Sequence, residues 1–240
     1  MKLIKNAYWY AAMVVSTFVM FLKFNAYKKQ KDNLPKEKYE DLVNDTARKW
    51  AVFQMKNTGS KINVYGLENL PDGGVLFVSN HQSYFDTGIF LGYIPKNKGL
   101  IAKIETSKIP LVQSAMKQLR CIFLDRKDLR QGAKAILEGI ETLKEGYSLV
   151  VFPEGTRGEG GEMLPFKTGA FKLATKSKAP IVPVTIDGAY KIMPKNSKLL
   201  HAAEVDVTIH EPIQTINLTP EEEKELPQLV YKTIEKAITK

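Results

Sequence analysis

Residues 147–157 read Tyr147-Ser-Leu-Val-Val-Phe-Pro-Glu-Gly-Thr-Arg157. The first six residues are an apolar, β-rich run, which is typical of a buried strand. Pro153 ends that strand because it has no N–H to donate, and Gly155 permits a tight turn after it. The stretch therefore predicts a strand that delivers two charged side chains, Glu154 and Arg157, to the loop at its end.

Similar apolar runs occur on both sides of this stretch and alternate with helical patterns. The expected strands cover residues 74–79, 100–102, 121–124, 147–152, 181–186 and 205–209. The expected helices cover residues 86–94, 109–119, 129–145, 167–178 and 220–238. Such alternation predicts an α/β fold with a mainly parallel central sheet flanked by helices. Ligands bind sheets of this kind where the strands end in loops.

The size of the chain fits one core with a terminal extension. It has 240 residues, of which 44% are hydrophobic, and that is too few for two independent domains plus linkers. We expect a two-helix membrane anchor over residues 1–60 and a catalytic domain over residues 61–240. The single Cys121 excludes an internal disulfide and a cysteine-rich metal cluster, and its apolar neighbours predict a buried thiol.

Positive charge is concentrated in the N-terminal extension. Residues 1–61 contain 12 Lys and Arg against 5 Asp and Glu, whereas residues 62–240 contain 23 against 21. Basic residues beside an apolar segment attract anionic lipid headgroups. Nucleic-acid binding would require basic residues spread over the folded body. We therefore expect an anionic phospholipid membrane, and no nucleic acid, as a partner.

An uncharged stretch of 17 residues lies between Lys5 and Lys23. As a helix it would measure roughly 26 Å, just short of the ~30 Å hydrocarbon core of a bilayer. No small-residue cleavage site follows it, so we expect it to be retained. A second, amphipathic helix is expected over residues 36–56. Either both helices dip into one leaflet as a hairpin, or the first spans the bilayer and the second packs beneath it. A buried core helix is the third interpretation of the first segment.

The segment Asn80-His-Gln-Ser-Tyr-Phe-Asp86 follows the strand that ends at Ser79. Side chains five residues apart share neither a helix face nor a strand face, so His81 and Asp86 meet only if the chain turns between them. An imidazole can remove a proton from an alcohol at cellular pH, and a carboxylate can orient that imidazole. The pair predicts a general base with its orienting group, while a loop-capping His and a metal pair remain alternatives.

A further strand, Ile122-Phe-Leu-Asp-Arg126, ends in a charged pair. We expect Arg126 at the same sheet edge as His81, where its planar guanidinium suits the oxygens of a phosphate. A surface salt bridge to Asp125 or Asp128 is the alternative.

Together these segments resemble, in the same order, the sequence blocks of the glycerolipid acyltransferases, the 1-acylglycerol-3-phosphate acyltransferase family. Residues 80–86 match its NHxxxxD signature. Residues 152–157 are similar to its FPEGTRS block, with Gly158 in place of the usual Ser. Residues 122–126 and 181–186 are similar to two further blocks, and the resemblance spans roughly residues 62–190.

The resemblance implies an acyltransferase in which His81 and Asp86 are catalytic. It implies no metal and no cofactor, with acyl-CoA or acyl-carrier protein as co-substrate. The acyl group would pass to the sn-2 hydroxyl of lysophosphatidic acid and form phosphatidic acid. The implied substrate-binding residues are Lys103, Arg126, Glu154, Gly155, Thr156 and Arg157. Because the acceptor resides in the bilayer, we expect the enzyme at the cytoplasmic face of the cell membrane, held as a monotopic protein or by a single anchor.

Two other classes of function compete with this interpretation. A hydrolase could use Ser79 or Ser83 as a nucleophile with His81, although neither serine lies in a Gly-x-Ser-x-Gly elbow. A non-catalytic membrane-binding protein would explain the N-terminus but would leave the His-Asp and Glu-Gly-Thr-Arg clusters without a purpose.

Overall fold

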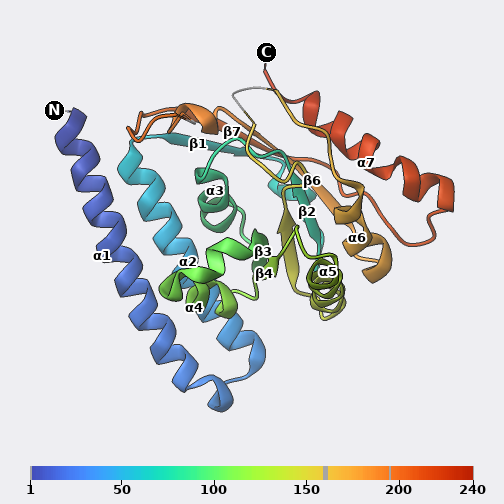
Figure 1. The fold of residues 1–240 in the computed structure, drawn as a ribbon, viewed down its shortest axis with the longest axis horizontal. Helices are drawn as coiled ribbons and strands as arrows, with labels where there is room; N and C mark the ends of the chain where they lie inside the picture. The colour runs from blue at the N-terminus through green and yellow to red at the C-terminus, as the bar shows by residue number, and fades with distance from the viewer. Residues whose placement is uncertain (1, 159–161, 195, 240) are drawn as a thin grey trace.

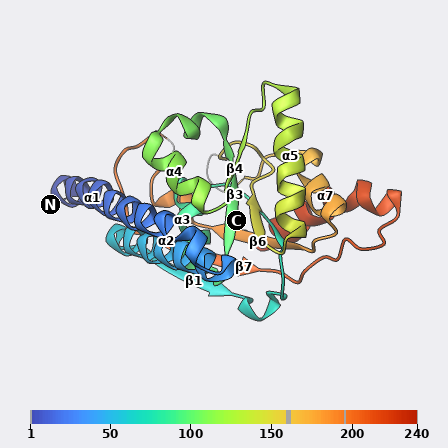
Figure 2. The ribbon, with the colours of Figure 1, turned by 90° about the horizontal axis from the view of Figure 1, so that it is seen from below.

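The computed structural model describes residues 2–158, 162–194 and 196–239, which form one sheet with helices on both faces (Figures 1 and 2). The strands are β1 (Lys61–Tyr65), β2 (Leu76–Ser79), β3 (Lys98–Lys103), β4 (Ile122–Leu124), β5 (Ser148–Val151), β6 (Ile181–Asp187) and β7 (Glu204–Ile209). The helices are α1 (Lys2–Lys29), α2 (Lys36–Thr58), α3 (Phe85–Tyr93), α4 (Pro110–Gln118), α5 (Leu129–Lys144), α6 (Lys172–Ser177) and α7 (Pro220–Glu235). This is the expected α/β fold.

The strands pair in the order β1-β7-β6-β2-β5-β3-β4. Every neighbouring pair is parallel except β6 and β7. Five strands, β2 to β6, therefore point the same way, and their carboxyl ends share one edge of the sheet. The mainly parallel arrangement predicted from the alternating pattern is confirmed.

Alternate side chains of the central strands build two separate cores. Phe77 of β2 packs with apolar side chains of α1 to α4 on one face. Its neighbours Leu76 and Val78 pack with α5, α6 and α7 on the other face. A strand buried on both faces needs apolar residues at successive positions. This is why β2 and β5 appear in the sequence as continuous apolar runs.

The sheet also contains a strand that the sequence pattern did not predict. β1 lies at the edge beside β7, and its ends, Lys61 and Tyr65, are exposed. The three residues between them, Ile62, Asn63 and Val64, are partly buried. A short alternating run is a weaker signal than a continuous apolar run, so the first strand expected from the sequence was the next one, β2.

The first two helices form a hairpin in which each has a different environment (Figure 1). α2 presents a stripe at four-residue spacing to the body of the protein, made of Tyr39, Val43, Ala47, Ala51 and Met55, all buried. Polar bonds tie the two helices together, because Trp50 Nε1 donates to Thr17 Oγ1 (3.2 Å) and Gln54 Nε2 to Ser16 Oγ (2.6 Å).

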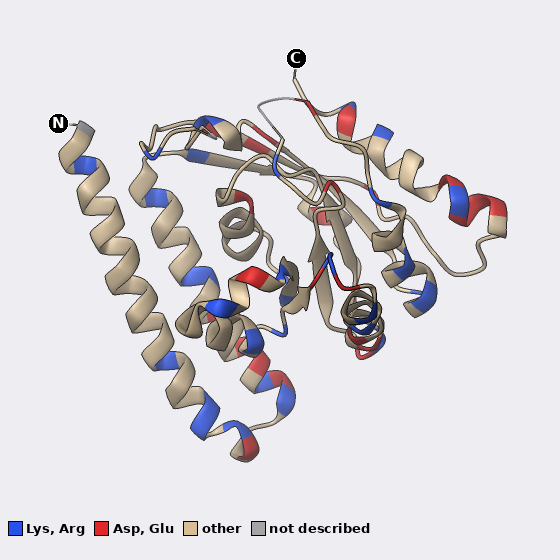
Figure 3. Cartoon of the chain, viewed as in Figure 1, with Lys and Arg blue, Asp and Glu red and all other residues tan. Residues whose placement is uncertain are grey.

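α1 is longer than its uncharged centre and is exposed along its outer side. Its 28 residues correspond to about 42 Å, because the lysine-bearing turns on either side are helical too. Figure 3 shows the uncharged middle of α1 and the charged residues that gather near its ends. Among the described residues, the segment Leu3–Lys29 is long and apolar enough to cross a membrane, and 17% of its most apolar window is buried. Such a helix is consistent with membrane binding.

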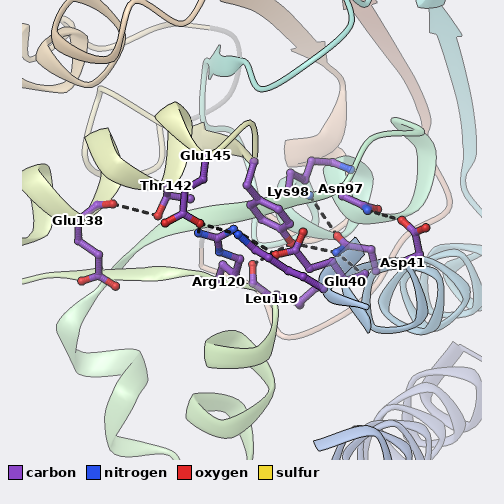
Figure 4. A network of polar contacts seen from close by, with 12 residues as sticks. Glu40, Asp41, Asn97, Lys98, Leu119, Arg120, Glu138, Thr142 and Glu145 are labelled. Atoms are coloured by element: carbon purple, nitrogen blue, oxygen red, sulfur yellow. Dashed lines mark hydrogen bonds and ion pairs between the residues drawn. The ribbon is translucent and has the colours of Figure 1, made fainter. Parts of the chain in front are cut away.

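A network of charged and polar groups joins α2 to the amino ends of the strands (Figure 4). Arg120, which precedes β4, donates to Glu40 of α2 (3.1 Å) and to Glu145 at the end of α5 (2.8 Å). Its guanidinium also lies 4.8 Å from the centroid of the Tyr147 ring. Asn44 of α2 donates to the Tyr147 hydroxyl (2.9 Å). These contacts fix α2 against the body at the sheet edge opposite the carboxyl ends.

Candidate active site

The turn after β2 is held by side-chain amides that bond to backbone groups. Asn80 Nδ2 donates to the Ile186 carbonyl (2.8 Å), and Asn80 Oδ1 accepts from the Ile186 N–H (2.9 Å). Gln82 Oε1 accepts from the Ala189 N–H (3.1 Å). The chain then enters α3 at Phe85. The local fold thus places an imidazole at the strand end and a carboxylate in the first turn of the next helix.

His81 and Asp86 meet across this turn. Nδ1 of His81 lies 2.7 Å from Oδ2 of Asp86. The same oxygen accepts the backbone N–H groups of Gln82 (2.7 Å) and Ser83 (2.8 Å). The Asp86 side chain is completely buried, whereas 19% of the His81 side chain is exposed. The carboxylate is therefore fixed by three donors, while one side of the imidazole faces outward.

An aromatic ring supports the imidazole from below. The His81 ring stacks on Phe152, which follows β5, with 4.3 Å between ring centroids. Phe152 in turn packs edge-on against Phe90 of α3. With Asp86 at Nδ1 and Phe152 against its face, the ring has little freedom to rotate. The carboxylate acceptor assigns the Nδ1 proton, so Nε2 carries the free lone pair.

Glu154 binds the loop after β5 to the loop after β2. Its Oε1 accepts the His81 N–H (2.7 Å), and its Oε2 accepts the Leu164 N–H (2.9 Å). Burial raises the pKa of the Glu154 carboxyl, and the two backbone N–H bonds oppose that rise. The Gly158 N–H donates to the His81 carbonyl (2.9 Å). The backbone of His81 is thus held on both sides by the Glu-Gly-Thr-Arg loop.

Gly155 and Gly158 fill positions in this loop where a larger residue would be strained. Gly155 has a φ of +78°, a left-handed conformation that glycine adopts without penalty. A Cβ on Gly158, where the family usually has Ser, would lie 2.8 Å from the Glu162 carbonyl. Residues 159–161, which follow Gly158 in the sequence, lie outside the described residues.

Arg157 is part of the Glu-Gly-Thr-Arg loop, and Arg126 contacts this loop from the end of the neighbouring part of the sheet, after β4. The Arg157 guanidinium lies 3.6 Å from the centroid of the Tyr84 ring, within the His-Asp segment. Arg126, just after β4, donates to the Gly155 carbonyl. Partial burial lowers the pKa of Arg126, and the nearby charge of Glu105 opposes that shift. Thr156 is exposed beside them.

Lys103 lies at the carboxyl end of β3, on the same edge, with an exposed side chain. The residues expected to bind substrate therefore lie on or around one loop, with the exception of Lys103. The described residues provide no polar contact for the Lys103 side chain. Two residues of the site were not among the expected ones. The Tyr84 ring stacks against the Arg157 guanidinium, and the Lys167 side chain lies beside Gly155. Only the place of Tyr84 inside the His-Asp segment could have indicated it.

The hydroxyls of Ser79 and Ser83, the two serines considered as nucleophiles, do not hydrogen-bond to the His81 ring within the described part of the chain. The Ser79 hydroxyl donates to the Asn80 carbonyl (3.1 Å), and the Ser83 hydroxyl is fully buried. Within the described part of the chain, neither is hydrogen-bonded to the His81 ring. No group of three or more His, Cys, Asp or Glu residues that could hold a metal occurs among the residues described. Cys121 is buried, as expected.

Comparison with known proteins connects this geometry to a family. Residues 61–187, more than half of the chain, match the family described as Acyltransferase. A chloroplastic 1-acyl-sn-glycerol-3-phosphate acyltransferase of Brassica napus is 40% identical over 156 residues, which cover 64% of this chain and 45% of that protein. The chain thus spans about half the length of the chloroplastic relatives. A 1-acyl-sn-glycerol-3-phosphate acyltransferase of Borreliella burgdorferi is 32% identical over 181 residues, covering 75% of this chain and 72% of that protein.

The likeness extends to three dimensions. The crystal structure of the 1-acyl-sn-glycerophosphate acyltransferase PlsC from Thermotoga maritima matches with a TM-score of 0.83 at 30% sequence identity. The match covers 98% of this chain and 93% of that one, so it includes the N-terminal helices as well as the sheet.

Proposed function

The chain belongs to the Acyltransferase family, and from that premise we propose that it acylates the sn-2 hydroxyl of 1-acylglycerol-3-phosphate to form phosphatidic acid. The acyl donor is acyl-CoA or acyl-carrier protein. The observation that carries the proposal is the 2.7 Å contact between His81 and Asp86 at a strand end, beside the loop that contains Arg157 and that Arg126 contacts. A base next to guanidinium groups suits an acceptor that carries both a hydroxyl and a phosphate.

In the proposed mechanism the acceptor hydroxyl gives its proton to His81 Nε2 as its oxygen attacks the thioester carbonyl. Asp86 keeps the Nδ1 proton in place and stabilises the imidazolium that forms. The tetrahedral intermediate then collapses, the carbon–sulfur bond breaks, and the imidazolium returns a proton to the leaving thiolate. Arg157 and Arg126 bind the acceptor phosphate, and Lys103 contributes positive charge at the same edge.

Membrane attachment follows from the acceptor, which resides in a bilayer. We assign it to the outer side of α1, whose exposed apolar residues include Val15 and Phe18, while the inner side of α1 packs on α2 and on the body. The hairpin then lies in the cytoplasmic leaflet and holds the carboxyl edge near the headgroups. Phe18→Glu should reduce sedimentation with anionic vesicles, whereas Leu229→Glu on the exposed side of α7 should not. Equal sedimentation of the two variants would refute this assignment.

The decisive experiment supplies purified protein with lysophosphatidic acid and labelled acyl-CoA, or acyl-carrier protein, in detergent. Labelled phosphatidic acid is the expected product, and digestion with a phospholipase specific for the sn-2 ester should release the label. Label that remains on the glycerol after this digestion would contradict the sn-2 assignment. A burst of acyl-enzyme with Ser79 or Ser83 labelled would instead favour the hydrolase, since direct transfer forms no covalent intermediate.

A further inference from the structure

A second cation faces the Glu-Gly-Thr-Arg loop beside Arg126. A Cβ built on Gly155 would lie 2.9 Å from Arg126 Nη1 and also 2.9 Å from Lys167 Nζ. The two charged nitrogens therefore lie no farther apart than twice that distance. A side chain at residue 155 would clash with both cations, so glycine is what lets the two charged nitrogens lie close to this Cα.

The backbone holds Lys167 in this position. The Lys167 N–H donates to the Pro153 carbonyl (3.0 Å). Three residues earlier, the Leu164 N–H is bound by Glu154 (2.9 Å), the same carboxylate that holds His81. The segment before α6 is thus fastened to the loop after β5 at two points. These backbone bonds therefore hold Lys167 close to the loop that contacts His81, although the two residues are 86 positions apart in the sequence.

Among the residues that the structure describes, no carboxylate neutralises the charge of this pair. Two like charges this close repel one another unless an anion lies between or beside them. Within the described part of the chain, neither Arg126 nor Lys167 has a carboxylate at ion-pair distance; Glu105 acts on Arg126 only from farther away. Arg126 donates to the Gly155 carbonyl, which leaves its remaining N–H groups for a ligand.

From this geometry we propose that Lys167, with Arg126, forms the site for the phosphate monoester of the acceptor, beside Gly155. The two cations supply charge-assisted hydrogen bonds to the phosphate oxygens. Lys167 binds the acceptor directly and takes no part in proton transfer. The inference rests on the proposed acyl transfer to a lysophospholipid.

The test replaces Lys167 and compares it with a matched lysine. Lys167→Gln replaces the charged group with a neutral amide on a side chain one atom shorter, Lys167→Arg restores the charge, and Lys176→Gln makes the same change at an exposed lysine on α6. Lys167→Gln should raise the KM for lysophosphatidic acid about tenfold, the loss expected for one charged hydrogen bond. It should leave kcat and the donor KM unchanged. Lys167→Arg should recover most of the affinity, and Lys176→Gln should behave as the wild type.

Two kinetic results would overturn the proposal. One is an acceptor KM that is the same in Lys167→Gln and Lys176→Gln. The other is a rise in the donor KM with an unchanged acceptor KM, because the pair would then serve phosphates of the donor.

A binding measurement separates this inference from the proposed function. Glycerol 3-phosphate should raise the unfolding midpoint of the wild type and of Lys176→Gln, and fail to do so with Lys167→Gln. That result supports the site even if the protein transfers no acyl group to lysophosphatidic acid. A wild type that does not respond to glycerol 3-phosphate would overturn it. Equal midpoints of all variants without ligand verify that the substitutions leave the fold intact.

Discussion

At the carboxyl edge of the sheet, the charged side chains of Arg126, Arg157 and Lys167 lie on or beside the Glu-Gly-Thr-Arg loop and lack carboxylate partners within the described residues. At the amino edge, in contrast, Arg120 is bonded to two carboxylates. Both edges have similar residue types, and both join elements far apart in sequence. The difference is whether the positive charge is already neutralised. Paired charges hold α2 on the body, and unpaired ones leave room for an anion, so substitutions at the two edges should affect different measurements.

The largest effect is expected for His81→Ala. Loss of the general base should lower kcat by about 10³-fold. The protein should stay folded, with the free energy of unfolding lowered by roughly 1–3 kcal/mol because the buried Asp86 loses one of its three donors. His201→Ala, at an exposed histidine, is the matched control and should retain full activity. Phosphatidic acid formation and urea unfolding report the two quantities. Wild-type turnover by the His81 variant would refute the mechanism.

Arg157→Ala tests the unpaired charge that lies over Tyr84. We expect the KM for lysophosphatidic acid to rise about tenfold or more, with a smaller change in kcat, because a charged hydrogen bond to phosphate is lost. Arg48→Ala, at an exposed residue paired with Asp45 on α2, should change neither constant. An effect on kcat alone would place Arg157 at the reacting atoms rather than at the phosphate.

Arg120→Ala should lower stability and leave the kinetic constants unchanged, the opposite of Arg157→Ala. It leaves Glu40 without its partner and removes a contact with the Tyr147 ring, so the free energy of unfolding should fall by about 1–2 kcal/mol. The specific activity of the folded protein should stay the same, since Arg120 lies at the amino ends of the strands. Chemical denaturation with a parallel activity assay would show both. A loss of activity at full stability would contradict the separation of the two edges.

The effect that is smallest over a single pH unit is a pH dependence of stability at Lys98, the first residue of β3. Burial lowers the pKa of Lys98 to about 7, so between that pH and its ordinary pKa of 10.5 the unfolded chain binds more protons than the folded one. Stability should therefore rise with pH above 7, by up to about 1 kcal/mol per unit. Lys98→Met should remove this rise. If the free energy of unfolding of the wild type and of Lys98→Met changes equally from pH 7 to 9, the expectation is wrong.

Most of the sheet and the meeting of His81 with Asp86 could be inferred from sequence because their signals are local. Apolar runs mark strands that are buried on both faces, and parallel strands bring their ends to one edge. Local patterns failed where tertiary contacts decide the outcome. β1 is a short edge strand whose apolar residues alternate with polar ones and are only partly buried. Lys167 approaches Gly155 because Glu154 bonds to the Leu164 N–H and so holds the segment before Lys167. Glu154 itself bonds to two backbone N–H groups, and its contact with substrate remains a prediction.

The amide of Asn80 has a consequence for how the strand before the site ends. Its two bonds to Ile186 copy the donor and acceptor of a peptide group, so the side chain serves as one more rung of the β2–β6 ladder. The main chain can then leave the sheet at once while β6 still finds a partner. A carboxylate there would supply no donor and would face the Ile186 carbonyl. The strand can therefore end abruptly enough for the next residue to point away from the sheet.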